Sequence, residues 1–195
     1  LFLIPIGIYI LLVIIIDPYN YFNVSKVVDD NIKESISYKL DYPLWKFLRF
    51  KESPKNTILL GDSRTNAINI DIIKKITRKE CYNFAYGGGS LKEIIDTFWN
   101  VSKLIKLSNV YIGINFDLYN KYNQSDRIGD AYHASENIIA YVFSKSNIKA
   151  ILLILKYEIF HNKIAIGVPR LTKQKFWDYE LNVTAKSMYM NYHYP

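Results

Sequence analysis

Three short apolar segments, each followed by small or polar residues, limit the folds open to this chain more than any other feature. They are 57–60 (Thr-Ile-Leu-Leu), 81–85 (Cys-Tyr-Asn-Phe-Ala) and 110–114 (Val-Tyr-Ile-Gly-Ile). Segments of this kind are typical of buried strands in a parallel sheet. Helical patterns fill the intervals between them, over 68–77 and 91–107. The alternation predicts an α/β fold whose parallel strands are joined by right-handed crossovers.

Length, charge and cysteine content narrow the class of protein further. The 195 residues are 50% hydrophobic, which is enough for one core of ordinary domain size. The single cysteine, Cys81, excludes an internal disulfide, and its place in an apolar segment predicts a buried, unreactive thiol. The net charge of +7 is spread along the chain and forms no basic stripe. Nucleic acid is therefore not expected as a partner, whereas an anionic lipid or polymer suits this charge.

The first residues carry a signal for the compartment. Residues 1–16 form an apolar run without a single charge, and Asp17-Pro18 ends it. A helix that spans a bilayer needs about 20 such residues, so we expect residues 1–17 to be the visible part of a longer transmembrane anchor. Three aromatic residues follow at the depth of an aromatic belt: Tyr19, Tyr21 and Phe22. The alternative is a helix buried in the core. The anchor predicts a single-pass protein of the cytoplasmic membrane with its domain facing outward.

The rest of the chain divides near Pro54. Residues 18–54 are predicted to be a polar connector, with an amphipathic element at 42–48 that lies either on the membrane or on the domain. Residues 55–195 are predicted to form the N-terminal part of the domain. No convincing fourth strand follows, because the segment 163–168 is short and bounded by breakers. One edge of the sheet is therefore expected to remain unpaired.

The residues that follow the three strands carry the groups that acyl chemistry needs. In parallel α/β sheets, ligands bind at the carboxyl ends of the strands. Ser63 follows Gly61-Asp62 at a strand-to-helix turn, where an exposed hydroxyl is suited to act as a nucleophile. Gly88 lets a backbone N–H approach a substrate oxygen, and Asn115 offers a side-chain donor. The Ser63 N–H, the Gly88 N–H and the Asn115 amide together predict a three-donor oxyanion hole.

These motifs resemble the SGNH/GDSL hydrolase superfamily. The matching blocks are, in chain order, 61–63 (Gly-Asp-Ser), 83–88 (Asn-Phe-Ala-Tyr-Gly-Gly) and 113–115 (Gly-Ile-Asn). The resemblance covers roughly residues 55–120 and implies a three-layer α/β/α parallel sheet. It implies a serine O-acyl esterase or acyltransferase that uses no cofactor and no metal ion. The bacterial, membrane-anchored branch that the chain resembles implies an acylated cell-envelope polysaccharide or a teichoic-type polymer as substrate.

The acid/base pair that the family uses is not found at its usual place. The family has Asp-x-x-His near the C-terminal end of the domain, after further strands. Asp130 and His133 have this spacing, but they come soon after the third strand, whereas the family has this pair after its last strand. His161 follows the apolar segment 151–160 and is interpreted as a helix-end residue, and His193 has no Asp three residues before it and is interpreted as a loop residue. We therefore expect the catalytic histidine to lie beyond Pro195, with Asp130 and His133 as the alternative pair.

A second departure keeps another class of function open. The family usually has Asp directly after the Asn of its third block, whereas this chain has Phe116 and then Asp117. The alternative is a catalytically inactive SGNH-like module that binds a cell-envelope polymer or assists its export. Asp62 is predicted to hydrogen-bond the turn and not to act as a catalytic acid. Arg64 has two interpretations, a contact to an anionic substrate or an ion pair on the first helical turn.

Overall fold

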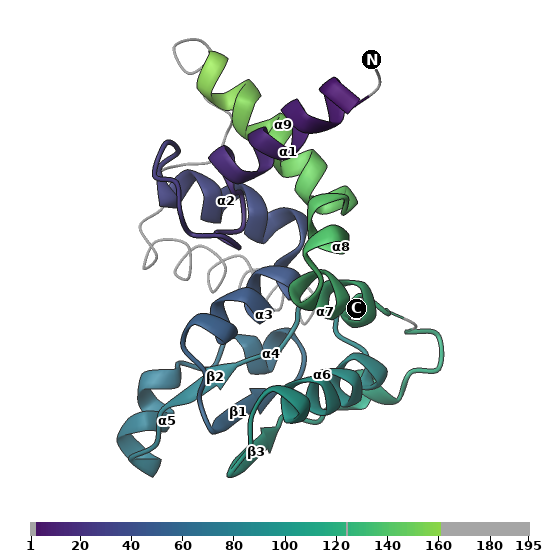
Figure 1. Cartoon of the computed structure of the whole chain (residues 1–195). Helices are drawn as coiled ribbons and strands as arrows, with labels where there is room; N and C mark the ends of the chain where they lie inside the picture. Colours follow the sequence, from purple (N-terminus) through teal and green to yellow (C-terminus); the bar gives the residue numbers. More distant parts are fainter. Residues whose placement is uncertain (1–2, 124, 161–195) are drawn as a thin grey trace. The chain divides into compact units, whose positions relative to one another are not determined.

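The computed structural model describes residues 3–123 and 125–160, which Figure 1 traces from the purple N-terminal helix to the light green helix α9. The elements in chain order are α1 (Leu3–Ile16), α2 (Asp30–Leu40), α3 (Tyr42–Glu52), β1 (Thr57–Leu60), α4 (Ser63–Asn66), α5 (Ile70–Thr77), β2 (Cys81–Asn83), α6 (Leu91–Leu104), β3 (Asn109–Ile112), the 3-10 helix η1 (Phe116–Tyr119), α7 (Ile128–Glu136), α8 (Ile138–Val142) and α9 (Lys145–Phe160).

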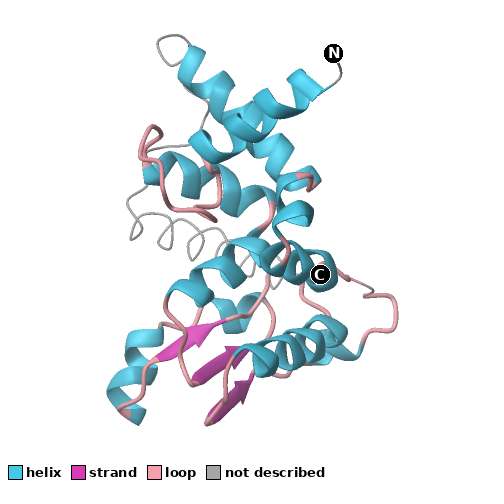
Figure 2. Ribbon diagram, in the orientation of Figure 1, coloured by secondary structure: helices cyan, strands magenta, loops and turns pink. Residues whose placement is uncertain are grey.

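A small parallel sheet lies at the centre of the predicted α/β region. Its strand order is β2-β1-β3, and Thr57 of β1 is in register with Cys81 on one side and Asn109 on the other. Figure 2 shows the three magenta strands side by side, with cyan helices around them. All four residues of β1 are buried, as expected for a central strand. The prediction of an α/β fold with a parallel sheet is confirmed.

The edge strand β3 is more exposed than the centre of the sheet. Its residues Tyr111 and Ile112 are exposed, whereas Ile58 and Leu60 of β1 are fully buried. Among the described strands, β3 pairs with β1 alone. The expectation of an unpaired apolar edge stays a prediction, because the residues after position 160 lie outside the described part of the chain. The segment 163–168 lies outside the described residues.

The region that we expected to be a connector contributes to the core. Residues 18–54 contain α2 and α3, and α3 buries Leu44, Phe47 and Phe50 completely. The helix begins at Asp41, whose side chain accepts a hydrogen bond from the Leu44 N–H. Its apolar face packs against the residue after β2 and against α7, with the ring centre of Phe47 5.3 Å from that of Phe84 and 5.5 Å from that of Tyr132. The amphipathic element at 42–48 therefore lies on the domain.

The N-terminal helix α1 is shorter than the predicted anchor. It ends at Ile16, and the buried carboxylate of Asp17 accepts hydrogen bonds from three following backbone N–H groups, at 2.7 to 3.0 Å. No helix in the described residues is long and apolar enough to cross a membrane, so the transmembrane helix predicted over residues 1–17 is not supported. The predicted aromatic belt is instead packed inside the protein: Tyr19 is fully buried, and Tyr21 stacks on Tyr141 with ring centroids 4.3 Å apart.

Candidate functional site

Ser63 lies in a tight turn between the central strand and a short helix. Strand β1 ends at Leu60, and α4 begins at Ser63, whose side chain is exposed. Asp62 is the N-cap residue, and its Oδ1 accepts hydrogen bonds from the N–H groups of Arg64 at 3.0 Å and Thr65 at 3.4 Å. The prediction that Asp62 hydrogen-bonds this turn is confirmed. The Asp62 side chain thus stabilises the turn, and the Ser63 side chain remains exposed to solvent.

Thr65 explains why glycine occurs at the ends of two neighbouring strands. Its buried side chain lies between Gly61 after β1 and Gly113 after β3. A Cβ added at either glycine would overlap the Thr65 hydroxyl oxygen. Both glycines therefore let α4 sit directly on the carboxyl ends of the strands. This close packing brings the Ser63 helix against the sheet edge where the third motif begins.

Asn115 connects the loop after β3 to the Ser63 turn. Its side-chain Nδ2 donates a hydrogen bond to Oδ2 of Asp62. Its Oδ1 accepts from the N–H groups of Asp117 at 2.8 Å and Leu118 at 3.3 Å, which begins η1. An amide nitrogen carries two hydrogens, so one N–H of Asn115 is left for a ligand after the bond to Asp62. The structure thus brings the first and third predicted motifs into direct contact.

Gly88 lies in the loop that follows β2, next to the same turn. The Tyr86 N–H donates to the Gly61 carbonyl at 2.9 Å, so the loop extends the pairing of β2 with β1. Gly88 has a φ of +63°, a conformation that favours glycine, and an added Cβ would meet open space. Among the described residues, no acceptor takes a hydrogen bond from the N–H of Ser63 or Gly88. Both N–H groups therefore remain available to an anionic oxygen.

An ion pair between the partly exposed Arg127 and the buried Glu93 fixes the glycine loop to the helices around it. The guanidinium of Arg127 donates two hydrogen bonds of 2.7 Å to the carboxylate of Glu93, which is fully buried. Arg127 also donates to the Gly87 carbonyl at 3.3 Å and to the Tyr42 hydroxyl at 2.8 Å. Tyr42 in turn donates to the Gly87 carbonyl at 2.8 Å. Burial raises the pKa of the Glu93 carboxyl, but the hydrogen bonds and charge of Arg127 outweigh it and hold this pKa below its usual value.

Lys46 contacts the short helix that carries Ser63, and the sequence alone did not indicate this role. It lies in α3, is almost fully buried, and donates to the Asn66 side-chain oxygen at 2.8 Å and to the Ala85 carbonyl. Its ammonium group also lies 5.4 Å from the centre of the Tyr86 ring. No carboxylate among the described residues forms an ion pair with it, and burial lowers its pKa to about 7. Lys46 joins the end of the Ser63 helix to the segment that leads to the glycine loop.

The predicted acid/base residues do not join this site in the described part of the chain. Asp130 and His133 are exposed on α7, and His133 makes no side-chain hydrogen bond to a described residue. His161 and His193 lie outside the described residues. Arg64 pairs with Asp117 at 3.1 Å, which agrees with the ion-pair interpretation of this arginine. The structure thus joins the loop of Asn115 directly to the turn of Ser63 and pairs the segment before Gly88 with the same strand end, and the described residues provide no base in contact with Ser63.

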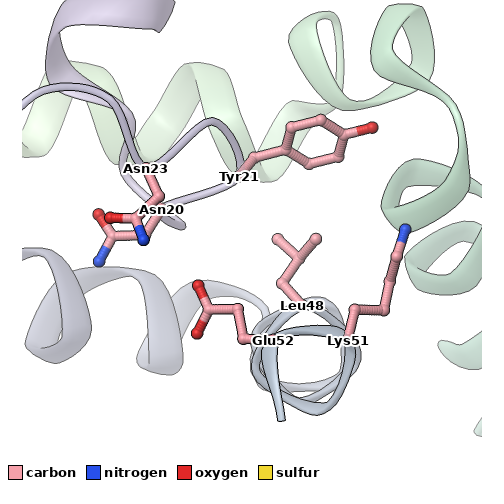
Figure 3. Close-up of a pocket in the computed structure, with 6 residues that line it drawn as sticks. All are labelled: Asn20, Tyr21, Asn23, Leu48, Lys51 and Glu52. Atoms are coloured by element: carbon pink, nitrogen blue, oxygen red, sulfur yellow. The ribbon is translucent and has the colours of Figure 1, made fainter. Parts of the chain in front are cut away.

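A surface hollow of about 290 Å³ lies elsewhere, between the loop after α1 and helix α3 (Figure 3). Asn20, Tyr21 and Asn23 line it from the loop, and the lining residues of α3 are Leu48, Lys51 and Glu52. The two charged groups are engaged with neighbours, since Lys51 donates to the Ser135 carbonyl at 2.6 Å and Glu52 pairs with an arginine at 2.6 Å. No residue of the Ser63 site lines this hollow, so it is not the candidate active site.

Comparisons of the chain with protein-family models, curated proteins and solved structures find no match. The assignment of the site therefore depends on the three strand-end motifs and on the contacts that the structure gives them.

Proposed function

We propose that this chain carries the nucleophile and oxyanion groups of a serine O-acyl esterase or acyltransferase of the SGNH/GDSL type. The observation that carries the proposal is the contact between Asn115 and Asp62, directly beside the exposed Ser63. This contact joins the first and third motifs, and the loop of Gly88, which belongs to the second motif, extends the pairing of β2 with β1. The three-layer α/β/α arrangement of that family belongs to the same proposal.

In the proposed reaction, Ser63 Oγ attacks the carbonyl carbon of an ester, and the carbonyl oxygen becomes an oxyanion. The N–H groups of Ser63 and Gly88 and the second amide hydrogen of Asn115 donate to that oxyanion. A histidine takes the Ser63 proton and returns it to the leaving alkoxide. The acyl group is then transferred from Ser63 to water in an esterase, or to an acceptor hydroxyl in a transferase. Helix α4 has only four residues, so the backbone N–H groups contribute more than its dipole.

The substrate class and the location of the enzyme form a second part of the proposal, and they depend on the resemblance alone. The substrate is an acylated cell-envelope polysaccharide or a teichoic-type polymer, and the domain faces outward from the cytoplasmic membrane. Membrane-impermeant maleimide tests the location on cells that produce a Cys81→Ser, Lys121→Cys variant. Labelling of intact cells is expected. Labelling only after the cells are broken would overturn the outward location.

A fluorophosphonate probe tests the covalent mechanism. The full-length protein is expected to be labelled at Ser63, and mass spectrometry of the tryptic peptide identifies the modified residue. The Ser63→Ala variant is the matched control, because the exposed hydroxyl makes no contact that the fold needs. If wild-type protein gives no adduct under conditions that label a control esterase, Ser63 is not an activated nucleophile.

A second candidate function is favoured by two observations. The Asn115 amide already donates to Asp62, and no described histidine contacts Ser63. This arrangement also suits an inactive SGNH-like module that binds a cell-envelope polymer or assists its export. The two functions differ in the probe experiment, because a binding module gives no Ser63 adduct. It would nevertheless retain acylated polymer in a pull-down, and Ser63→Ala would bind the polymer as well as wild type.

A further inference from the structure

Helix α1 leaves most of its apolar surface without a protein partner. Val13 and Ile16 pack into the core, whereas Ile4, Ile8 and Leu11 on the opposite side are 55 to 65% exposed. These three residues share one side of the helix, because they are separated by four and three positions. The helix contains no charged residue. Its outer side is therefore an aliphatic surface that no described part of the chain covers.

Helix α9 packs against α1 and has an outer side that combines aliphatic residues with lysines. The two helices cross in Figure 1, and they are in contact. Asn147, Ala150 and Ile154 face the core, whereas the outer side carries three exposed aliphatic residues and three exposed lysines. The aliphatic residues are Ile148, Leu152 and Leu153, and the lysines are Lys145, Lys149 and Lys156. We call the outer sides of these two helices the α1–α9 face.

The charged side chains that the structure describes on the outer side of the α1–α9 face are all lysines. The structure describes no acidic side chain in α1, in α8 or in residues 145–157 of α9. The neighbouring helix α2 has two exposed acidic residues, Asp30 and Glu34, and one exposed lysine, Lys39, and Asp30 pairs with Lys26 at 3.3 Å. Helix α5 differs, since its exposed isoleucines lie beside Asp71 and a Lys74–Glu80 ion pair. Aliphatic exposure without acidic residues is thus a property of the α1–α9 face and not of every exposed helix.

We propose that the α1–α9 face docks on an anionic lipid surface, with its aliphatic side chains among the acyl chains and its lysines at the headgroups. Exposed aliphatic area and lysines that pair with no described carboxylate lie on the same helices, and these are the two features that interfacial binding requires. Lysine stems extend along apolar surface while their ammonium groups reach the headgroups. A second copy of the chain is a poorer occupant, because its own α1–α9 face would bring the same three lysines, and the described outer side of that face offers no carboxylate to pair them. The proposal does not depend on the activity of Ser63.

Vesicle co-sedimentation of the full chain tests this proposal. Wild-type protein is expected to bind vesicles of phosphatidylcholine mixed with phosphatidylglycerol, and to bind phosphatidylcholine vesicles at least about tenfold more weakly. The variants Leu11→Ser and Leu152→Ser are each expected to weaken binding about tenfold. Each removes one leucine side chain that would be buried among the acyl chains in the bound state. The double variant Lys149→Glu, Lys156→Glu is expected to abolish the preference for the anionic vesicles.

Helix α5 and Ser63 supply matched controls. Ile76→Ser and Lys75→Glu change an exposed isoleucine and an exposed lysine outside the α1–α9 face, and they should bind vesicles as wild type does. Ser63→Ala should also bind normally, so a failure of the proposed catalysis and a failure of this proposal remain distinguishable. Equal binding to both kinds of vesicle, or normal binding by the Leu152→Ser variant, would overturn the proposal. A dimer that dissociates in Leu11→Ser, with no vesicle binding by wild type, would assign the face to a second copy.

Discussion

Asn115 donates a hydrogen bond from its side-chain amide to the carboxylate of Asp62, and so joins the loop after β3 to the turn that carries Ser63. Because Asp62 also accepts from the N–H groups of Arg64 and Thr65, this carboxylate is the common acceptor of the turn and the neighbouring loop. The geometry of the candidate oxyanion hole therefore depends on one residue pair.

Replacing Asn115 by Asp should turn this attraction into repulsion. Two carboxylates at hydrogen-bond distance cannot both ionise without cost, so one of them acquires a raised pKa in the folded variant. We expect Asn115→Asp to lose about 1–3 kcal/mol of unfolding free energy near neutral pH. Because this pKa is raised in the folded variant, the loss of unfolding free energy grows as the pH rises through the raised pKa. The loss becomes smaller as the solution is acidified. Urea unfolding at about pH 5 and about pH 8 measures the difference.

The variant Asn115→Ala is the control for that experiment. It removes the same hydrogen bond and the start of η1 but introduces no charge, so its loss of stability should not change between the two pH values. An equal loss for Asn115→Asp at both pH values would contradict the repulsion argument.

The packing of Thr65 between two glycines leads to a prediction about rescue. An alanine Cβ at Gly113 would overlap the Thr65 hydroxyl but would lie 3.1 Å from its Cβ. Gly113→Ala should therefore lose about 1–3 kcal/mol, and Thr65→Ala should restore much of this loss. At Gly61 the added Cβ would lie only 2.5 Å from the Thr65 Cβ, which remains in the Thr65→Ala variant. Thermal unfolding of both double-mutant cycles should show rescue at Gly113 and none at Gly61; equal rescue at both positions would contradict this geometry.

The strands and the Ser63 turn could be predicted from the sequence because their signals are local. Strand β1 has the bounds expected, and Ser90 begins α6 in a capping box with Glu93, as its N-cap type suggests. The turn at Asp62 follows from a polar residue between a buried strand and a helix. The ends of strands were less predictable: β2 ends at Asn83 because the side chain of this residue turns back to bind α4 and the Ala85 N–H.

The parts that could not be predicted depend on partners distant in the sequence. Lys46 looks like an ordinary exposed lysine until α3 packs on the sheet, because only then do Asn66 and Ala85 surround it. One signal was present, since Lys46 is flanked by Trp45 and Phe47 in an apolar segment. The role of residues 18–54 was missed for the same reason: the core contacts of α3 are made with elements that follow it in the chain.

The ion pair of Glu93 with Arg127 should matter more than the surface ion pairs. Glu93→Gln removes the negative charge that pairs with the Arg127 guanidinium. Because Arg127 is only partly exposed, water cannot fully replace that partner. We expect a loss of about 2–4 kcal/mol in urea unfolding near neutral pH. The lowered pKa of Glu93 contributes stability that is present above its unfolded pKa and is lost as the pH falls through the folded value. The difference in free energy of unfolding between the wild type and Glu93→Gln should therefore become smaller in acid.

The neighbouring residue Lys92 provides the comparison. It pairs with Asp96 and Asp126 at the surface, so Lys92→Ala should change the unfolding free energy little at any pH. If Lys92→Ala destabilised the protein as much as Glu93→Gln, burial would not be what makes the Arg127 pair important.

Lys46 should give the protein a stability that rises with pH. Burial lowers its pKa to about 7, well below the usual value of 10.5, so the unfolded chain binds the proton more tightly than the folded protein does. The cost of holding this lysine is therefore greatest below pH 7 and is relieved between pH 7 and the unfolded pKa. The free energy of unfolding of the wild type should therefore rise by on the order of 2–3 kcal/mol between about pH 6 and about pH 9.

The variant Lys46→Met fills the same space without a titrating group and should lack this rise. Urea unfolding of both proteins across that range measures the difference, with Lys75→Met on the exposed face of α5 as the matched control. Parallel pH profiles for wild type and Lys46→Met would show that Lys46 keeps its proton in the folded protein.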